Sequence, residues 1–161
     1  MEARFDFMHT EFGRNFLGKF VAASQAVTDS PLPVTVQDLV KIRASQINGC
    51  GVCTDMHTKD ALAAGETQQR LNLVAAWRDA KVFTEPERAA LALAEQATRI
   101  ADSAGVDDET WEMARKQFDD EQLAALIAVI AVINTFNRFN VIVRNPAGDY
   151  EPGMYGGKTA S

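Results

Sequence analysis

Apolar residues recur at three- and four-residue intervals along most of the chain, and this interval is typical of helices. Over residues 8–27 they form one continuous stripe, which predicts an amphipathic helix. Pro31 and Pro33 then end it, because proline removes a backbone donor and restricts the residue before it. The stripe consists of Met8, Phe12, Phe16, Phe20, Ala23 and Val27. His9 lies beside this stripe and is interpreted as a surface histidine.

A helix, a tight turn and a second helix are predicted next. Thr35 is a suitable N-cap for a helix that runs to about Ile47. The pair Asn48-Gly49 favours a left-handed turn that stops this helix. The second helix covers about residues 50–64, and Gly65 closes it. The turn therefore joins the end of one helix directly to the start of another.

Capping signatures mark the remaining helices. Thr84-Glu85-Pro86-Glu87 starts one, and acidic residues that suit the positive end of a helix dipole start two more. The expected segments are 66–77, 84–100, 107–118 and 120–143. Within the last, Leu123–Ile133 is apolar on every side, so we expect it at the centre of the domain or sealed by another subunit. The sequence predicts one all-α domain over residues 1–161, whose end, 146–161, is a Pro- and Gly-rich tail.

Composition narrows the class of protein. The net charge of −6 and the absence of any basic run argue against a nucleic-acid binder, which needs clustered Lys and Arg. The N-terminus lacks the apolar core of a signal peptide, and Leu123–Ile133 is too short to cross a bilayer. We therefore expect a cytoplasmic protein without membrane association.

Both cysteines of the chain lie together as Cys50-Gly51-Val52-Cys53, and His57 follows them. In a reducing compartment such a pair is more often catalytic or metal-binding than structural. A Cys50 that begins a helix meets unpaired N–H groups and the positive end of the dipole, which favour its thiolate. Cys53 lies one turn further on, within reach for a disulfide. His57 lies on the same face, where an imidazole can take a cysteine proton.

Two further questions about this stretch stay open. Asp38, on the preceding helix, is the nearest carboxylate in sequence that would orient His57, and it is equally well interpreted as a plain capping residue. Cys50, Cys53 and His57 also supply three soft ligands for a metal ion. No fourth ligand is apparent, and a helix-borne CxxC is unlike a zinc knuckle. A redox site without a bound metal or cofactor is therefore the preferred interpretation.

The stretch from Asp38 to His57 resembles the core of the AhpD-like alkylhydroperoxidases, which belong to the carboxymuconolactone decarboxylase superfamily. The likeness covers roughly residues 30–145. It continues through Thr58–Ala61, Gly65-Glu66, Ala76–Arg78, Glu87–Leu93, Ile133-Asn134 and Asn137-Arg138. The resemblance implies an all-helical AhpD-like fold, assembly as trimers or hexamers, and a peroxidase cycle that uses both cysteines.

By the same resemblance, Cys53 is the peroxidatic thiolate and Cys50 the resolving cysteine, which an external reductant reaches. His57 belongs to a proton relay that ends in a carboxylate, and Asp38 stands where the family usually has a glutamate. Because aspartate is one methylene shorter, three outcomes are open: it reaches through an added water, the relay is weaker, or another carboxylate such as Glu95 substitutes. Glu95 is otherwise interpreted as a helix-surface residue.

The predicted function is the reduction of hydroperoxides with a dithiol as electron donor, such as a lipoyl protein or a thioredoxin-like protein. The alternative is a CxxC disulfide reductase or redox sensor without significant peroxidase turnover. The lactone decarboxylases of the superfamily are disfavoured, since that branch lacks the cysteine pair. A non-catalytic helical oligomer leaves the cysteines and His57 unexplained. Val52 stands where some members have a histidine, which the cysteine cycle does not need.

Overall fold

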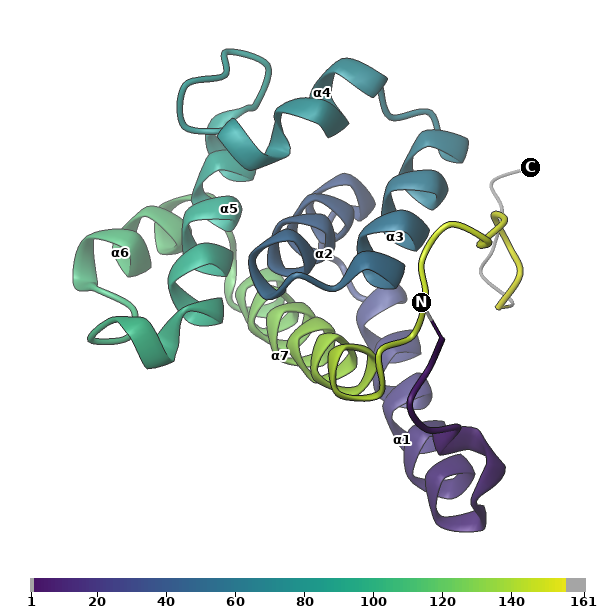
Figure 1. Ribbon diagram of the computed structural model, residues 1–161. Coiled ribbons are helices and arrows are strands. Elements are labelled where there is room, and N and C mark those ends of the chain that lie inside the picture. The colour runs from purple at the N-terminus through teal and green to yellow at the C-terminus, as the bar shows by residue number, and fades with distance from the viewer. Residues whose placement is uncertain (1, 156–161) are drawn as a thin grey trace.

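Helix α2 (Val34–Asn48) runs through the middle of the molecule and contacts the three helices around it (Figure 1). These are α3 (Gly51–Ala63), α5 (Glu85–Thr98) and α7 (Asp120–Val143). Its buried residues lie on more than one side of the helix: Val36, Gln37, Leu39, Val40, Ile42, Ala44 and Ser45. The segment that leads into the cysteines is therefore held inside the core.

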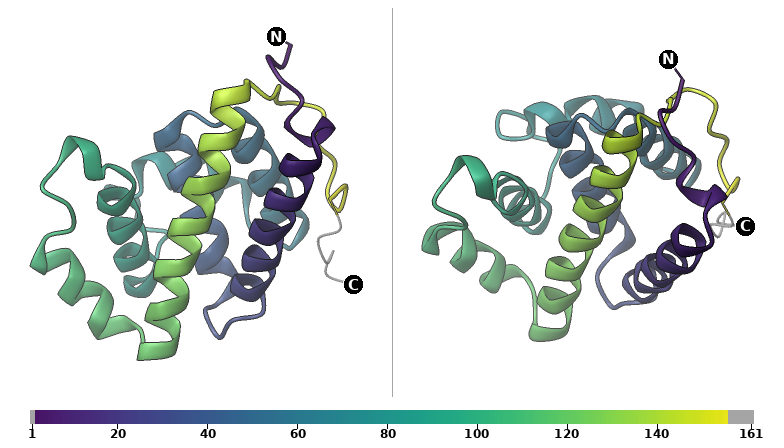
Figure 2. Two further views of the ribbon diagram at one scale, coloured as in Figure 1. Left: turned by 90° about the horizontal axis from the view of Figure 1, so that it is seen from below. Right: turned by 60° about the horizontal axis from the view of Figure 1, so that its bottom comes forward.

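The computed structural model describes residues 2–155, and within that range every regular element is helical. The other elements, in which η marks a short 3-10 helix, are η1 (Phe7–His9), α1 (Glu11–Thr28), α4 (Gln68–Leu73), η2 (Val74–Ala76), η3 (Ile100–Asp102) and α6 (Asp108–Gln117). Both views in Figure 2 show α1 and α6 on opposite sides of α7. The predicted all-α fold class is confirmed.

Most predicted helix ends are confirmed, because their signals are local. Gly49 follows α2 with a φ of 66°, and its N–H bonds back to the carbonyls of Ser45 and Gln46. Thr84 and Asp119 form capping boxes that begin α5 and α7. The turn before the cysteines is thus specified by the few residues that form it.

The predicted N-cap at Thr35 is wrong. Helix α2 begins at Val34, and Pro33 occupies the N-cap without any side-chain capping bond. The ring of Pro33 restricts its φ, here −53°, to a value close to that of a helix, so the helix starts early. Asp38 consequently lies in the second turn, and its interpretation as a capping residue is also wrong.

Helix α7 is central on one side only. Leu126, Val129 and Ile133 are buried, whereas Ile127 and Ala131 on the outer side are exposed. The helix has the length and apolar composition of a membrane span, but its inner side is part of the core of the bundle. The expected central position therefore holds for the inner side, and covering of the outer side by another subunit stays a prediction.

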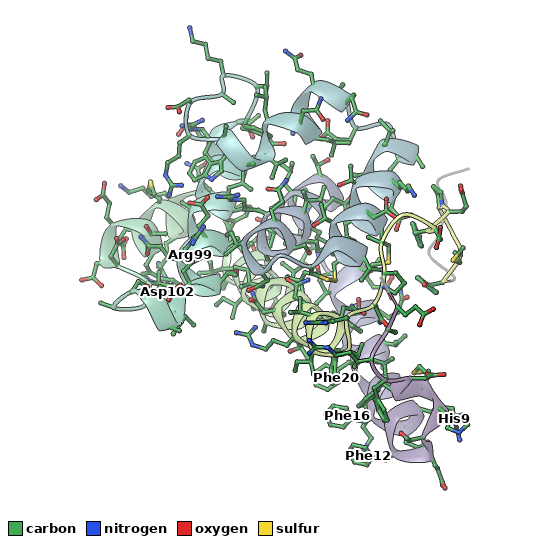
Figure 3. All side chains as sticks on the ribbon, in the orientation of Figure 1. His9, Phe12, Phe16, Phe20, Arg99 and Asp102 are labelled. Carbon is green, nitrogen blue, oxygen red and sulfur yellow. A yellow bond between two sulfur atoms is a disulfide. The ribbon has the colours of Figure 1, made fainter. Side chains whose placement is uncertain are left out.

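The stripe predicted over residues 8–27 forms helix α1, but most of it lies outside the core. Three of its rings line one side of α1 and His9 points to the other side (Figure 3): Phe12, Phe16 and Phe20. The two inner rings also pack against Phe139 of α7, while the ring of Phe12 is 71% exposed. A surface position for His9 is confirmed.

Candidate redox site

The two cysteines stand at the beginning of helix α3. Cys50 is the N-cap, with φ −81° and ψ 95°, and Cys53 is the third helical residue. Their sulfur atoms form a disulfide, with 5.4 Å between the Cα atoms, and each residue is 2% exposed. The Cys50 side chain makes no capping bond, so the N–H groups of the first turn keep their electrostatic effect on the sulfur atoms.

A network of buried polar side chains fixes the turn before Cys50 against α7. Nδ2 of Asn48 donates to Oδ1 of Asn134 and to Oδ1 of Asn137, at 2.9 Å in both cases. Nδ2 of Asn137 donates to Oγ of Ser45 at 3.0 Å. Buried polar groups are costly unless they are paired, so this network specifies one position of the turn relative to α7.

Asn140 of α7 reaches the sulfur itself. Its Nδ2 lies 3.4 Å from Sγ of Cys53 and also donates to the carbonyl of Phe136 at 3.0 Å. Asn145 donates to Oδ1 of Asn140 at 2.6 Å. Asn140 was not among the residues predicted from the sequence, although an amide within an apolar helix is a signal for a buried polar partner.

His57 lies one turn after Cys53 on α3 and is partly buried. Burial lowers the pKa of His57 to about 3, and the positive charge of Lys41 acts in the same direction. Among the residues that the structure describes, no hydrogen bond joins His57 to Cys53 or to Asp38. The site therefore holds a neutral imidazole at physiological pH, not a cation.

Asp38 is paired with Lys41, with 3.6 Å between Oδ1 and Nζ. Burial raises the pKa of Asp38, the ammonium of Lys41 opposes that rise, and the charges of Asp60 and Glu66 add to it. The carboxylate is thus a stronger proton acceptor than a surface aspartate. Lys41, which was not among the residues predicted from the sequence, acts on the pKa of both Asp38 and His57.

A pocket of about 390 Å³ opens beside Asp38, between α2, α3 and α4. Glu66 and Arg70 form part of its polar lining and are bound to each other at 2.9 Å. Its apolar wall includes Leu39, Ile42, Ala61 and Leu71. Neither cysteine is among the lining residues, so the carboxylate faces a space that is separate from the sulfur atoms.

Glu95 is already engaged by other side chains. It is 8% exposed and accepts hydrogen bonds from Arg43, Arg78 and Trp77, the last at 3.1 Å. Burial acts to raise the pKa of Glu95, but the hydrogen bonds from Arg78, Arg43 and Trp77 lower it overall. Its interpretation as a helix-surface residue is wrong, because α5 packs against α2 and directs this side chain inward. Asp38 therefore remains the candidate carboxylate.

The segment after α7 forms a C-terminal strap, residues 145–155, along helix α3. Nζ of Lys59 donates to the carbonyl of Tyr150 at 2.7 Å, and the Tyr150 hydroxyl donates to Asp60 at 2.8 Å. Tyr150 is 5% exposed, and burial raises its pKa to about 12, with Asp60 adding to the shift. These bonds hold the strap against the polar side of α3.

The C-terminal strap also covers the start of α3. A Cβ atom placed on Gly51 lies 3.2 Å from the Cβ of Ala147, so the two segments touch beside Cys50. The tail was predicted as a segment without periodicity, and the structure places its first part beside Gly51 at the start of α3. The rest of the predicted tail, 156–161, lies outside the described residues.

The interpretation as a metal site stays a prediction. Residues 2–155 contain no group of three or more His, Cys, Asp or Glu side chains placed to hold a metal ion. Cys50 and Cys53 are bonded to each other, and a metal needs their thiolates.

Sequence comparison connects these features to a family. The sequence model of the carboxymuconolactone decarboxylase family matches residues 15–96. YdfG from Bacillus subtilis (strain 168), an uncharacterized protein, is 44% identical over 93 residues, which are 58% of this chain and 63% of YdfG. The chain therefore spans less than two thirds of the length of that relative.

Solved structures share the fold. ATU0492 from Agrobacterium tumefaciens, a protein of unknown function and a candidate AhpD antioxidant defence protein, is 33% identical with a TM-score of 0.86, over 92% of this chain and 100% of that chain. An uncharacterized peroxidase-related protein from Silicibacter sp. TM1040 is 20% identical with a TM-score of 0.74, over 96% of this chain and 79% of that chain. The second likeness concerns the fold alone. The predicted AhpD-like fold is confirmed.

Proposed function

The chain belongs to the carboxymuconolactone decarboxylase family, and from this premise we propose that it is a thiol-dependent hydroperoxide reductase. The observation that carries the proposal is the Cys50–Cys53 disulfide at the start of α3, with Asn140 donating to the Cys53 sulfur. A disulfide between two such cysteines is the product of a two-cysteine peroxide reduction. The AhpD-like neighbour ATU0492 supports this assignment.

Cys53 carries the first step. Its thiolate attacks the terminal oxygen of a hydroperoxide, so that an S–O bond forms and the O–O bond breaks. The leaving alkoxide takes up one proton and departs as an alcohol, or as water when the substrate is hydrogen peroxide. The sulfur loses two electrons and becomes a sulfenic acid. The N-terminus of α3 and the Asn140 amide favour the thiolate that this attack requires.

Cys50 completes the oxidation. Its thiol condenses with the sulfenic acid of Cys53, which forms the disulfide and releases water. An external dithiol, such as a lipoyl or thioredoxin-like protein, then returns two electrons and two protons by thiol exchange. Because Cys50 is 2% exposed and the C-terminal strap touches Gly51, we expect the strap to shift when the donor binds.

His57 and Asp38 handle the protons. The neutral imidazole cannot store a proton at neutral pH, because its pKa is about 3, so it passes protons along hydrogen bonds. Asp38, whose pKa is raised by burial, is the better proton holder, and Lys41 tunes its charge. In this proposal the relay runs from Cys53 through His57 to Asp38, and a water molecule bridges each of the two steps, because within the described part of the chain no hydrogen bond joins His57 to either residue.

We also propose that the chain forms a homo-oligomer, a trimer or hexamer, in a reducing compartment such as the cytoplasm. The outer side of α7, with Ile127 and Ala131, and the ring of Phe12 on α1 offer apolar surface for a second subunit to cover. Light scattering should give the mass of an assembly at micromolar concentration. A clean monomer would contradict this proposal.

Turnover measurements test the function. Reduced wild-type protein is supplied with an organic hydroperoxide and dihydrolipoamide, and peroxide consumption is followed beside the Cys53→Ser and Cys50→Ser variants. We expect wild type to turn over repeatedly, Cys50→Ser to consume about one equivalent and stop, and Cys53→Ser to be inactive. The exposed Tyr155→Phe change serves as a control with wild-type rates.

The alternative function has its own outcome in the same experiment. If wild type and Cys53→Ser consume peroxide equally slowly while the wild-type disulfide exchanges rapidly with the dithiol, the protein is a disulfide reductase or redox sensor. Peroxide turnover above the Cys53→Ser rate separates the two functions.

A further inference from the structure

One side-chain donor on helix α7 contacts the sulfur of Cys53. Nδ2 of Asn140 lies 3.4 Å from Sγ, on a helix 87 residues away in the chain. In the disulfide the sulfur is a weak acceptor, whereas a thiolate in the same place is a strong one. The donor is therefore already in position for the reduced, reactive form of Cys53.

The orientation of the Asn140 amide is fixed by its other partners. The carbonyl of Phe136 can only accept, and it lies 3.0 Å from Nδ2, so the NH₂ group must point to that side. Nδ2 of Asn145 donates to Oδ1 of Asn140 at 2.6 Å, which holds the opposite end. With its oxygen occupied, the amide can present only an N–H to Cys53.

Within residues 2–155, the Asn140 amide is the one side-chain donor within hydrogen-bond distance of the Cys53 sulfur. His57 is neutral at physiological pH. Three cations of the helices around the cysteines bind other groups, namely Lys41 with Asp38, Lys59 with Asp55 and the C-terminal strap, and Arg138 with Asn134. A thiolate at Cys53 thus has the N-terminus of α3 and the Asn140 amide as its immediate stabilising groups.

We propose that Asn140 is a catalytic residue that stabilises the Cys53 thiolate by hydrogen bonding, and that Asn145 is a positioning residue that holds the Asn140 amide in its donating orientation. The proposal rests on the assignment of Cys53 as the attacking thiolate. Because Asn145 is the first residue of the C-terminal strap, it also couples the strap to the reactivity of the sulfur.

The test measures the pKa of Cys53 directly. In a Cys50→Ser background Cys53 is the single cysteine of the chain, and its rate of alkylation by iodoacetamide as a function of pH gives the midpoint of thiolate formation. Asn140→Ala should raise that midpoint by about one unit, which lowers the thiolate fraction about tenfold at a fixed pH below the midpoint. Asn140→Asp should raise it further, since a carboxylate repels the thiolate.

Two further variants separate this role from a structural one. Asn145→Ala leaves Asn140 in place and frees its oxygen, so a smaller shift is expected, about threefold in thiolate fraction. Thr135→Ala is the matched control, because it removes another side-chain bond to a carbonyl of α7 that is not part of the site, and the midpoint should not change.

The outcomes are distinct from those that test the peroxidase. The alkylation profile requires no peroxide turnover. If the midpoint shifts as expected in a protein that does not turn over peroxide, the hydroperoxide reductase function is refuted and the role of Asn140 in stabilising the thiolate stands. Unchanged midpoints in folded Asn140→Ala and Asn140→Asp would overturn the proposal. If Asn140→Ala and Asn140→Asp both fail to fold, Asn145→Ala becomes the deciding variant. An Asn145→Ala midpoint equal to that of Thr135→Ala would then overturn the proposal.

Discussion

The cysteine end and the carboxylate end of the candidate site are built from different interactions. At the cysteine end, neutral amides from α7 bind the turn, the amide of Asn140 contacts Sγ of Cys53, and Asn137 is fully buried. At the carboxylate end, Asp38 forms an ion pair with Lys41 and faces a pocket with a mixed polar and apolar lining. The amides hold the turn and the Cys53 sulfur in position without adding charge, whereas the ion pair with Lys41 sets the proton affinity of Asp38.

This difference indicates a division of work. A nucleophilic sulfur needs a fixed position and directed donors, which the amide network supplies through short, oriented bonds. A proton carrier needs a suitable pKa, which burial and Lys41 supply at Asp38. Changes at the cysteine end should therefore alter stability and sulfur reactivity, while changes at the carboxylate end should alter proton transfer.

The largest effect is expected at the amide network. Asn137→Ala removes one of the two acceptors of Asn48 and the donor to Ser45, so two hydrogen bonds and a fully buried side chain are lost. The free energy of unfolding should fall by about 2–4 kcal/mol. Chemical denaturation measures it, with Thr135→Ala as the control on the same helix. A loss no larger than that of the control would show that the network does not hold the turn.

Acid should destabilise the protein through His57. Because its folded pKa, about 3, lies below the ordinary 6.5, the unfolded chain binds the proton more readily in that window. Stability is therefore full above pH 6.5 and is lost as the pH falls toward 3, at about 1.4 kcal/mol per unit. His57→Gln should remove about 2 kcal/mol of the loss between pH 6.5 and about pH 5. Parallel pH profiles for wild type and variant would contradict the burial of a neutral imidazole.

A smaller effect is expected at the C-terminal strap. Tyr150→Phe removes the hydroxyl that donates to Asp60 at 2.8 Å. The unfolding free energy should fall by about 1 kcal/mol, and the strap should become more open to limited proteolysis. Tyr155→Phe, on an exposed ring, is the matched control. Equal proteolysis of the two variants would mean that the Tyr150 hydroxyl does not anchor the strap.

The smallest effect on the sulfur is expected from the carboxylate end. Asp38→Asn removes a charge that is paired with Lys41 and has no bond to Cys53. The pKa of Cys53 should move by less than about 0.3 unit, while peroxide consumption falls about tenfold or more because the relay loses its proton holder. A shift of the Cys53 pKa as large as that in Asn140→Ala would contradict the separate roles of the two ends.

The sequence was most informative where one short segment decides the outcome. Residues only a few positions apart determine this part of the fold: the end of α2 at Gly49, the start of α3 after Cys50, and the alignment of the cysteines with His57. The same local signals failed at Thr35, because Pro33 set the helix start first.

Local sequence signals do not predict contacts between segments that are distant in the chain. Asn140 meets Cys53 only because α7 returns past α3, and helical spacing does not reveal that contact. Periodicity also shows which residues share a face but not whether anything packs on it. Phe12 therefore belongs to a predicted stripe and is nonetheless exposed.

The most direct test of the account is the oxidation state of each cysteine after reduced protein meets one equivalent of hydroperoxide. Mass spectrometry with a sulfenic-acid trap should find the disulfide in wild type, a trapped Cys53 in Cys50→Ser, and no modified cysteine in Cys53→Ser. Two results would contradict the assignment of Cys53 as the peroxide-reducing thiolate. One is a sulfenic acid trapped on Cys50 of Cys53→Ser that forms as fast as the wild-type disulfide, and the other is a wild-type protein that stays reduced.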